Sequence, residues 1–165
     1  QAINVIIDLN TIQKNWGLDD FADFFATNDN KDLALPYATL KQIREQTGLN
    51  YTALVKIYST SSMAKFKRGE LVLDTFDFAE RFMGYLVDIS EYVPFFNNAR
   101  FILGYIYIAQ HEQYDHERMI AKLKLNDKKR KYPLDGESKP TSYGRLMQDI
   151  YNMHQKNDLV MFRKW

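Results

Sequence analysis

The stretch Leu40–Tyr58, LKQIREQTGLNYTALVKIY, has the pattern of two short helices joined by a tight turn. Leu40 and Ile43 recur at helical spacing, which gives the first helix one buried stripe. Gly48 stands where that helix must stop, because glycine tolerates the left-handed backbone that such a stop requires. Asn50 is a good N-cap for the second helix, since its side-chain oxygen can accept a hydrogen bond from an unpaired backbone N–H. The spacing therefore predicts two helices with a sharp corner between them.

Such a pair matches the pattern of a helix-turn-helix, here over about residues 37–58. In that motif the second helix enters the major groove of DNA and its outward side chains read the bases. The expected DNA-binding side chains on this helix are Asn50, Tyr51, Thr52 and Lys56. The alternative is that any two packed helices joined by a glycine turn look like this. Arg44 favours the alternative, because it occupies an inner site of the first helix where a small residue usually allows close approach.

Two basic segments are candidate phosphate contacts. Lys65, Lys67 and Arg68 lie close in sequence to the expected recognition helix and are predicted to flank it on the DNA backbone. A later basic run adds the phosphate contacts Lys128, Lys129, Arg130 and Lys131. Contacts of this kind would make affinity fall steeply with salt. The alternative for the later run is a solvated helix end whose cations offset the helix dipole.

The composition indicates a soluble globular protein with one core. The chain has 165 residues, of which 45% are hydrophobic and 26% charged, so we expect a single helical domain over residues 1–165. No apolar run approaches the roughly 20 residues that span a bilayer, so no membrane partner is expected. The absence of cysteine excludes disulfides and fits a reducing, cytoplasmic interior. The net charge of +1 is uneven, with −4 over residues 1–36 and +5 over the remainder, so only a local basic face could hold a polyanion.

Apolar residues recur at helical spacing along most of the remaining chain, which predicts an all-α fold with at most marginal strand. Only the run Ala2–Leu9 could be helix or strand by its period. The further expected helices are Leu18–Ala26, a helix capped by Asp74 and running through Val93, Phe96–Gln110, Asp115 to about Asn126, and Thr141 or Ser142 to about His154. The helix after Phe96 is apolar nearly all round and is predicted to be the central core helix. Its expected core residues are Phe101, Ile102, Tyr105 and Ile106.

No pattern of catalytic or metal-binding residues stands out. The segment His111–His116 contains two histidines, but it lacks the HExxH spacing that places two imidazoles one turn apart. Asp115 in that segment is better explained as a helix cap. No GxGxxG, GxxxxGK[ST] or GxSxG motif occurs, and paired acids such as Asp19 and Asp20 lie at helix starts, where the dipole explains them. We therefore expect no metal, no cofactor and no enzymatic activity.

Several short motifs resemble the helical region of ParB/sulfiredoxin-like proteins of phages and mobile elements. The stretch Ile7–Phe21, IDLNTIQKNWGLDDF, is similar to the LN-x-x-QK-x-W-x-x-x-DF string that leads from the ParB-type domain into a helical tail. Ile150-Tyr151-Asn152, followed by Lys156-Asn157, also resembles the close of such tails. The GERR- or DGQHR-like phosphate-binding motif of the N-terminal domain is absent from the sequence.

The resemblance implies that this chain is the C-terminal helical part of a longer, ParB-like protein. In that family a region with helix-turn-helix character follows the nuclease-like domain, so the implied partner is double-stranded DNA. Nucleotide binding or nuclease activity is carried over to no residue here. The first hypothesis is thus a non-catalytic DNA-binding or DNA-associated accessory domain. The alternative is a protein-interaction or oligomerisation module, which would bind a protein partner or form a homo-oligomer without binding DNA.

Overall fold

A computed structural model describes residues 15–165 of the chain. The run Ala2–Leu9 and residues 7–14 of the stretch that carries the resemblance lie outside the described residues. Within the described range all regular structure is α-helical, so the all-α prediction is confirmed there. The helices are α2 (Leu18–Ala26), α3 (Lys31–Thr47), α4 (Tyr51–Tyr58), α5 (Met63–Lys67), α6 (Phe76–Ile89), α7 (Ala99–Ala109), α8 (His116–Lys129) and α9 (Pro140–Tyr151).

Contacts divide the chain into two compact units, Gln1–Phe76 and Asp77–Trp165, called unit 1 and unit 2 below. Unit 1 contains α2 to α5, and unit 2 contains α6 after its first residue and then α7 to α9. Each unit encloses large aromatic side chains of its own, such as Phe66 in unit 1 and Phe101 in unit 2. The single domain expected over residues 1–165 stays a prediction.

The stretch Leu40–Tyr58 has the local geometry that its residues predict. α3 ends at Gly48, which has a left-handed φ of 71°, and Asn50 caps α4 with its side chain. The start of α3 differs from the prediction, because the helix begins at Lys31, before the expected helix-turn-helix at about residues 37–58. Asn30 caps it, and Pro36 lies inside the helix, where the proline ring leaves out one backbone hydrogen bond. DNA binding by these two helices stays a prediction.

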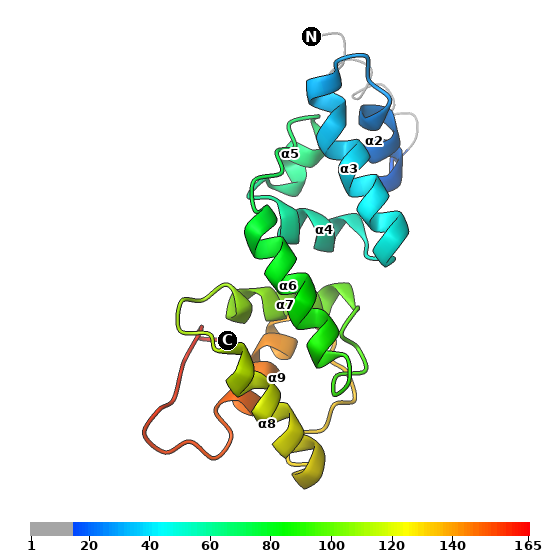
Figure 1. Cartoon of the computed structure of the whole chain (residues 1–165). Coiled ribbons are helices and arrows are strands. Elements are labelled where there is room, and N and C mark those ends of the chain that lie inside the picture. Colours follow the sequence, from blue (N-terminus) through cyan, green and yellow to red (C-terminus); the bar gives the residue numbers. More distant parts are fainter. Residues whose placement is uncertain (1–14) are drawn as a thin grey trace. The chain divides into compact units, whose positions relative to one another are not determined.

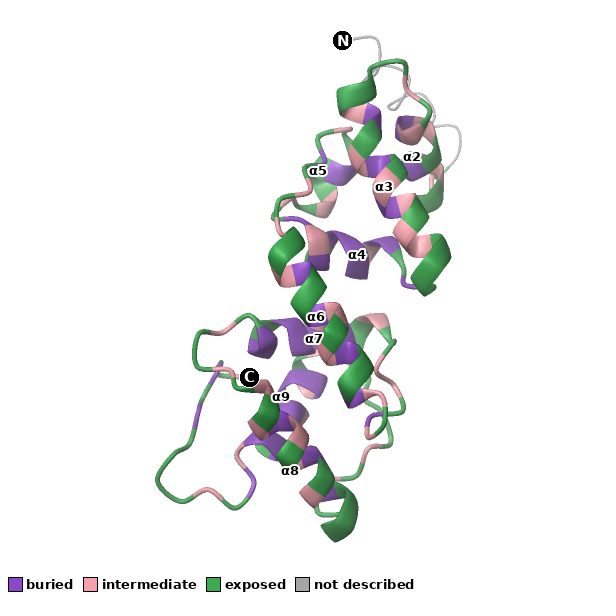
Figure 2. Cartoon of the chain, viewed as in Figure 1, coloured by how far each residue is buried: buried purple, intermediate pink, exposed green. Residues whose placement is uncertain are grey.

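A column of aromatic rings forms the core of unit 1, where α2 and α3 lie side by side (Figure 1). Phe25 of α2, Tyr37 of α3, Phe66 of α5 and Tyr51 of α4 follow one another at centroid distances of 4.8, 5.2 and 5.5 Å. The Tyr37 hydroxyl donates a hydrogen bond of 2.6 Å to the Phe66 carbonyl, and burial raises the pKa of Tyr37. α4 is coloured as buried over most of its length in Figure 2. It is thus a core element of unit 1.

In unit 2 the core helix is α7, and α9 lies beside it (Figure 1). The residues predicted for the core are confirmed, since each has 0% exposure: Phe101, Ile102, Tyr105 and Ile106. The two helices approach closely at Gly104. A Cβ atom there would lie 2.1 Å from the Pro140 carbonyl oxygen, so only glycine permits this approach. α7 is therefore held in place by its buried side chains and by its close backbone contact with α9.

α8 also contacts α9, but it is buried along one stripe only. Asp115 caps α8 by accepting a hydrogen bond of 3.1 Å from the Arg118 backbone N–H, as the sequence predicts. The buried residues of α8 are Met119, Leu123 and Asn126. Most of the remaining side chains of α8 are exposed or half-buried, so this helix presents a surface.

α3 is the longest helix of the described residues, with 17 residues, and it carries several charged side chains. Across residues 15–165, no helix combines the length and the apolar character needed to cross a bilayer. The cytoplasmic location stays a prediction.

Candidate functional site

The predicted recognition helix α4 is mostly covered. Tyr51 is only 2% exposed, because its ring lies against Phe66 at 5.5 Å and the Arg44 guanidinium lies 4.9 Å from its centroid. The expectation that Tyr51 faces outward to DNA is therefore wrong. Lys56 is exposed, and Thr52 and Tyr58 are half-buried, so these three side chains are the accessible part of α4.

The N-terminal end of α4 lies beside carboxylates. Asn50 is exposed, but its side-chain oxygen accepts the N–H three residues further on at 2.9 Å and so serves as the cap. Arg44 pairs with Asp19 at 3.0 Å, and Lys41 pairs with Asp23 at 2.6 Å. These pairs line a hollow next to Tyr51. Because Arg44 and Lys41 are already paired with acids, these two cations are poorly placed to contact DNA phosphates as well.

The first set of predicted phosphate contacts lies on α5 and at its end. Lys65 and Lys67 are exposed, and so is Arg68, which is the C-cap residue. Arg68 forms an ion pair of 3.2 Å with Glu70. α5 contacts α4 through the buried Phe66. Two exposed lysines and one arginine already paired with an acid therefore remain close to α4.

The second set lies at the C-terminal end of α8. Lys128, Lys129, Arg130 and Lys131 are all exposed, and Arg130 is the C-cap with a left-handed φ of 47°. We call these four residues the basic stretch. Asn126 fixes its base, because this buried amide donates to the Tyr132 carbonyl at 3.0 Å and accepts its N–H at 2.9 Å. Four exposed cations therefore lie at a helix end that the Asn126 hydrogen bonds hold in place.

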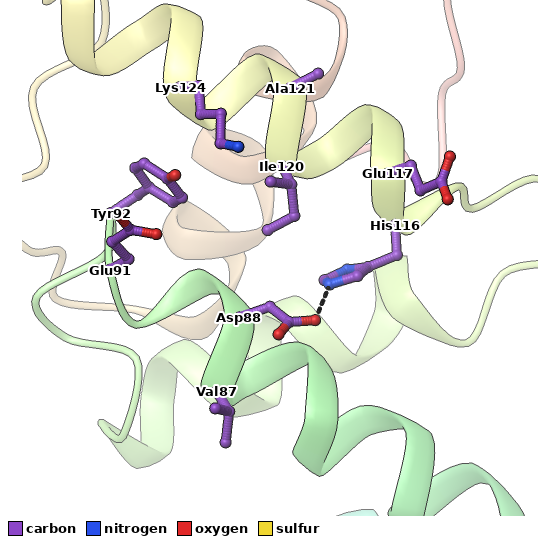
Figure 3. A pocket seen from close by; sticks show the side chains of 9 residues that line it. All are labelled: Val87, Asp88, Glu91, Tyr92, His116, Glu117, Ile120, Ala121 and Lys124. Carbon is purple, nitrogen blue, oxygen red and sulfur yellow. Dashed lines mark hydrogen bonds and ion pairs between the residues drawn. The ribbon is translucent and has the colours of Figure 1, made fainter.

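A groove of about 590 Å³ lies between α6 and α8, within unit 2 (Figure 3). α6 and the turn after it supply one wall, and α8 supplies the other. We call it the α6/α8 groove, and its lining residues are Val87, Asp88, Glu91, Tyr92, His116, Glu117, Ile120, Ala121 and Lys124. In Figure 3 Asp88 and His116 face each other, and Ile120 points into the space between the helices. The groove therefore combines an apolar centre with three carboxylates and one ammonium group.

A chain of hydrogen bonds leads from the groove into the core of unit 2. His116 Nε2 lies 2.9 Å from Asp88 Oδ2, and His116 Nδ1 lies 2.9 Å from the Tyr114 hydroxyl. The Tyr114 hydroxyl in turn bonds that of Tyr105. Burial raises the pKa of both Tyr114 and Tyr105, so these phenols stay protonated and neutral. Tyr85 stacks on His116 with ring centroids 4.0 Å apart, so the imidazole is held in one orientation.

This arrangement is suited to binding cations by charge and apolar groups by contact. Within residues 15–165, no group of three or more His, Cys, Asp or Glu side chains is placed to hold a metal ion. The carboxylates of the groove can pair with lysine or arginine side chains.

The sequence prediction missed the α6/α8 groove, although a signal for it exists. His116, Ile120 and Lys124 are spaced by four residues, as are Val87 and Glu91, so each set lies along one helix face. What the spacing could not reveal is that the two faces line the same groove. Asp88 and His116 are 28 residues apart in the chain.

Comparisons with protein-family models, with curated proteins and with solved structures find no match to this chain. The resemblance to ParB-like proteins accordingly stays a prediction.

Proposed function

We propose that this chain is a protein-interaction module whose α6/α8 groove binds a basic, amphipathic segment of a partner protein. One observation carries the proposal: apolar side chains lie accessible between carboxylates. Val87 is 68% exposed on α6, and Ile120 of α8 lines the same groove. Asp88, Glu91 and Glu117 line the same groove.

An amphipathic helix with lysine or arginine beside its apolar stripe matches both features of the groove. Its apolar side chains would cover Val87 and Ile120, which removes apolar area from water. Its cations would pair with Glu91 and Glu117, which favours basic over acidic partners and speeds association. Lys124 lines the groove together with these acids, so an acidic residue at one end of the segment would set its direction.

Protein binding is better supported than the reading of DNA bases by α4. Base reading needs side chains that reach the edges of the bases. Tyr51 is buried, Asn50 caps its own helix, and Asp19 and Asp23 lie beside the end of α4 that would approach the DNA. Thr52 and Lys56 alone offer little for sequence recognition. The chain is proposed to act by binding and without catalysis.

A designed helix of leucine and lysine, labelled with a fluorophore, is the probe that tests the groove. Fluorescence anisotropy with the full chain should show binding, and a leucine–glutamate helix of the same length should bind at least about tenfold more weakly. Glu91→Lys combined with Glu117→Lys should weaken binding of the basic helix by about tenfold or more.

The matched control is Asp135→Lys combined with Glu137→Lys, because it changes the net charge equally in an exposed loop outside the groove. This pair should leave the affinity nearly unchanged. Equal weakening by both pairs would mean that only the overall charge matters. No loss with either pair would mean that the groove is not the site, and both outcomes overturn the proposal.

The basic stretch supports a second candidate function, sequence-independent contact with DNA phosphates. Its four cations are exposed and consecutive, and Asp127 is the adjacent acid. If each cation meets one phosphate, changing Lys128, Lys129, Arg130 and Lys131 to Ala should reduce the slope of log affinity against log salt by about 3 to 4 units. Titration of a labelled duplex at several salt concentrations measures this slope. An unchanged slope excludes the basic stretch, and Lys56→Ala or Arg68→Ala tests α4 and α5 in the same assay.

A further inference from the structure

The last residues of unit 2 form an extended tail, residues 158–165, at the red end of the chain in Figure 1. Its side chains alternate in exposure. Val160 and Phe162 are 8% and 9% exposed, whereas Leu159 and Met161 are 58% and 64% exposed. Such alternation with a period of two is what an extended chain shows when one of its faces is buried. The tail therefore docks on the body of unit 2 by one apolar face.

Two side-chain amides of α9 and its C-cap bind the backbone of the tail. Asn152 donates to the Val160 carbonyl at 2.8 Å and accepts the Val160 N–H at 2.9 Å. Gln148, which is 3% exposed, accepts the Phe162 N–H at 2.8 Å. A primary amide carries one acceptor and two donors, so it can pair with a peptide group as a neighbouring strand would. These bonds fix the register of the tail without regard to its side chains.

The side chains of the tail are recognised separately. The Phe162 ring lies against Tyr151 and His111, with centroid distances of 5.0 and 5.3 Å. Arg118 donates to the Asp158 carboxylate at 3.0 Å and to the Asp158 carbonyl at 2.8 Å. The Arg118 side chain is only 15% exposed and lies 4.2 Å from the centroid of the Tyr151 ring. The arginine is thus held in place, which makes its contact with the acid specific.

Together these residues form a site for an extended peptide, which we call the tail groove. The groove is defined by His111, Arg118, Gln148, Tyr151 and Asn152. The segment that it holds has an acid, Asp158, then the buried Val160 two positions later, then the aromatic Phe162 two positions after that. A segment recognised in this way can be supplied by the same chain or by another one.

The connection between α9 and the tail carries backbone strain. His154 has a φ of 59°, a left-handed conformation that residues other than glycine adopt only at a cost. His154 is exposed, and residues 155–157 after it are exposed or half-buried. The backbone has this conformation where it turns between α9 and the tail that docks on unit 2 of the same chain. A tail that docks on another chain does not require the left-handed conformation at His154.

We propose that the tail groove takes the tail of a second copy of this chain, so that two chains exchange residues 158–165 reciprocally. The contacts within the groove are the same in both states, because the tail and the groove have the same sequence. Exchange costs the freedom lost on association and relieves the strain at each His154. The balance is therefore set by protein concentration and by the hinge at residues 154–157. This assembly is independent of the α6/α8 groove.

Complementation between two variants of the full chain tests the exchange. Val160→Asp with Phe162→Asp disables the tail and leaves the groove intact, whereas Gln148→Ala with Asn152→Ala disables the groove and leaves the tail intact. Each variant alone should remain at the monomer mass of 19.5 kDa in light scattering. Their equimolar mixture should contain a species of twice that mass, because one chain offers a tail and the other a groove.

A mixture that stays monomeric overturns the proposal, since the tail then docks only on its own chain. Dimers of the tail-disabled variant alone also overturn it, since another surface then holds the copies together. Circular dichroism checks that both variants keep their helices. As a measurement that needs no groove variant, a labelled peptide of residues 156–165 should bind the tail-disabled chain. The same peptide with Phe162→Asp should bind at least about tenfold more weakly, and equal binding counts against the groove.

Position 154 gives a matched pair of variants outside the groove. His154→Gly removes the strain of the left-handed backbone and should shift the equilibrium of the unaltered tail and groove toward monomer. His154→Val increases the strain and should shift it toward dimer. Because a dimer contains two hinges, each shift should be about tenfold or more in the dimer dissociation constant. Shifts in the opposite directions, or none, contradict the role of the hinge and with it the proposal.

Discussion

α4 and α8 are two of the helices to which the sequence assigned binding residues, and they differ in how far the structure buries them. α4 has eight residues, of which Tyr51, Ala53, Leu54, Val55 and Ile57 are buried. α8 has 14 residues, of which only Met119, Leu123 and Asn126 are buried. α4 is thus an internal helix of unit 1, whereas α8 is a surface helix of unit 2.

The difference shows that a helix-turn-helix pattern in sequence is not enough to make a recognition helix. A helix must be buried on one side to be held and free on the other to read a ligand. α4 meets the first condition so fully that only Lys56 is exposed and Thr52 and Tyr58 are half-buried. α8 meets both conditions, and its free side contributes Glu117, Ile120 and Lys124 to the α6/α8 groove.

The largest expected effect is a loss of stability when α4 loses a buried side chain. Tyr51→Ala should lower the free energy of unfolding by about 3–5 kcal/mol, because it removes a buried aromatic ring that packs on Phe66. Thr52→Ala, at the adjacent half-buried position, should change it by about 0.5 kcal/mol or less. Urea unfolding of both variants measures the contrast. If Tyr51→Ala costs less than about 1 kcal/mol, α4 is a surface helix and base reading becomes credible again.

The next effect concerns the end of α8. Asn126→Ala should cost about 1–3 kcal/mol, because the substitution leaves the N–H and the carbonyl of Tyr132 without the buried amide that pairs with both. Lys124→Ala on the exposed side of the same helix should cost about 0.5 kcal/mol or less. Thermal unfolding compares the two variants. Equal costs would contradict the view that α8 is anchored along one stripe.

A smaller effect separates capping from base reading at the start of α4. Asn50→Ala should cost about 1 kcal/mol through loss of the cap, whereas Asn50→Asp should keep most of the stability. Denaturant unfolding at neutral pH measures both. An alanine variant as stable as the parent chain would show that the Asn50 side chain is not needed as a cap and is free for another role.

The smallest effect is a pH dependence in the loop after α4. The Thr60 hydroxyl and, at 2.7 Å, the Thr60 backbone N–H donate to the Asp74 carboxylate, and these bonds hold the pKa of Asp74 below its usual range. Because the pKa is lower in the folded state, the stabilisation is present above the unfolded pKa and is lost as the pH falls through the folded pKa.

Asp74→Asn should therefore remove part of the stability at neutral pH and reduce the loss on acidification. Asp74 is exposed, so solvent screening limits the effect to about 0.5 kcal/mol or less. Unfolding curves collected from pH 7 down to acid compare the variant with the parent chain. A pH dependence that the substitution leaves unchanged would assign the acid sensitivity to other carboxylates.

The sequence by itself determined where several helices start and stop. Gly48, Asn50 and Asp115 act in the structure as the sequence predicts, because a cap or a left-handed stop involves atoms within about four residues of each other. The all-round apolar pattern of α7 was sufficient to identify Phe101 and its neighbours as core. Periodicity was less reliable at ends without such a cap. The expected helix Asp74–Val93 is observed as Phe76–Ile89, since Asp74 bonds to Thr60 and not to the helix start.

Only the tertiary structure decided which helix face is available. Tyr51 is covered by Phe66, the Asp88–His116 pair joins α6 to α8, and Asn152 meets Val160 of the tail. In each case the burial or the charge environment of a side chain depends on a residue outside the reach of its own helical turn. Local propensity fixes backbone conformation over a few residues, but the free energy of burial and of ion pairing comes from segments that meet in space. The helices could therefore be predicted from the sequence, while the α6/α8 groove and the tail groove could not.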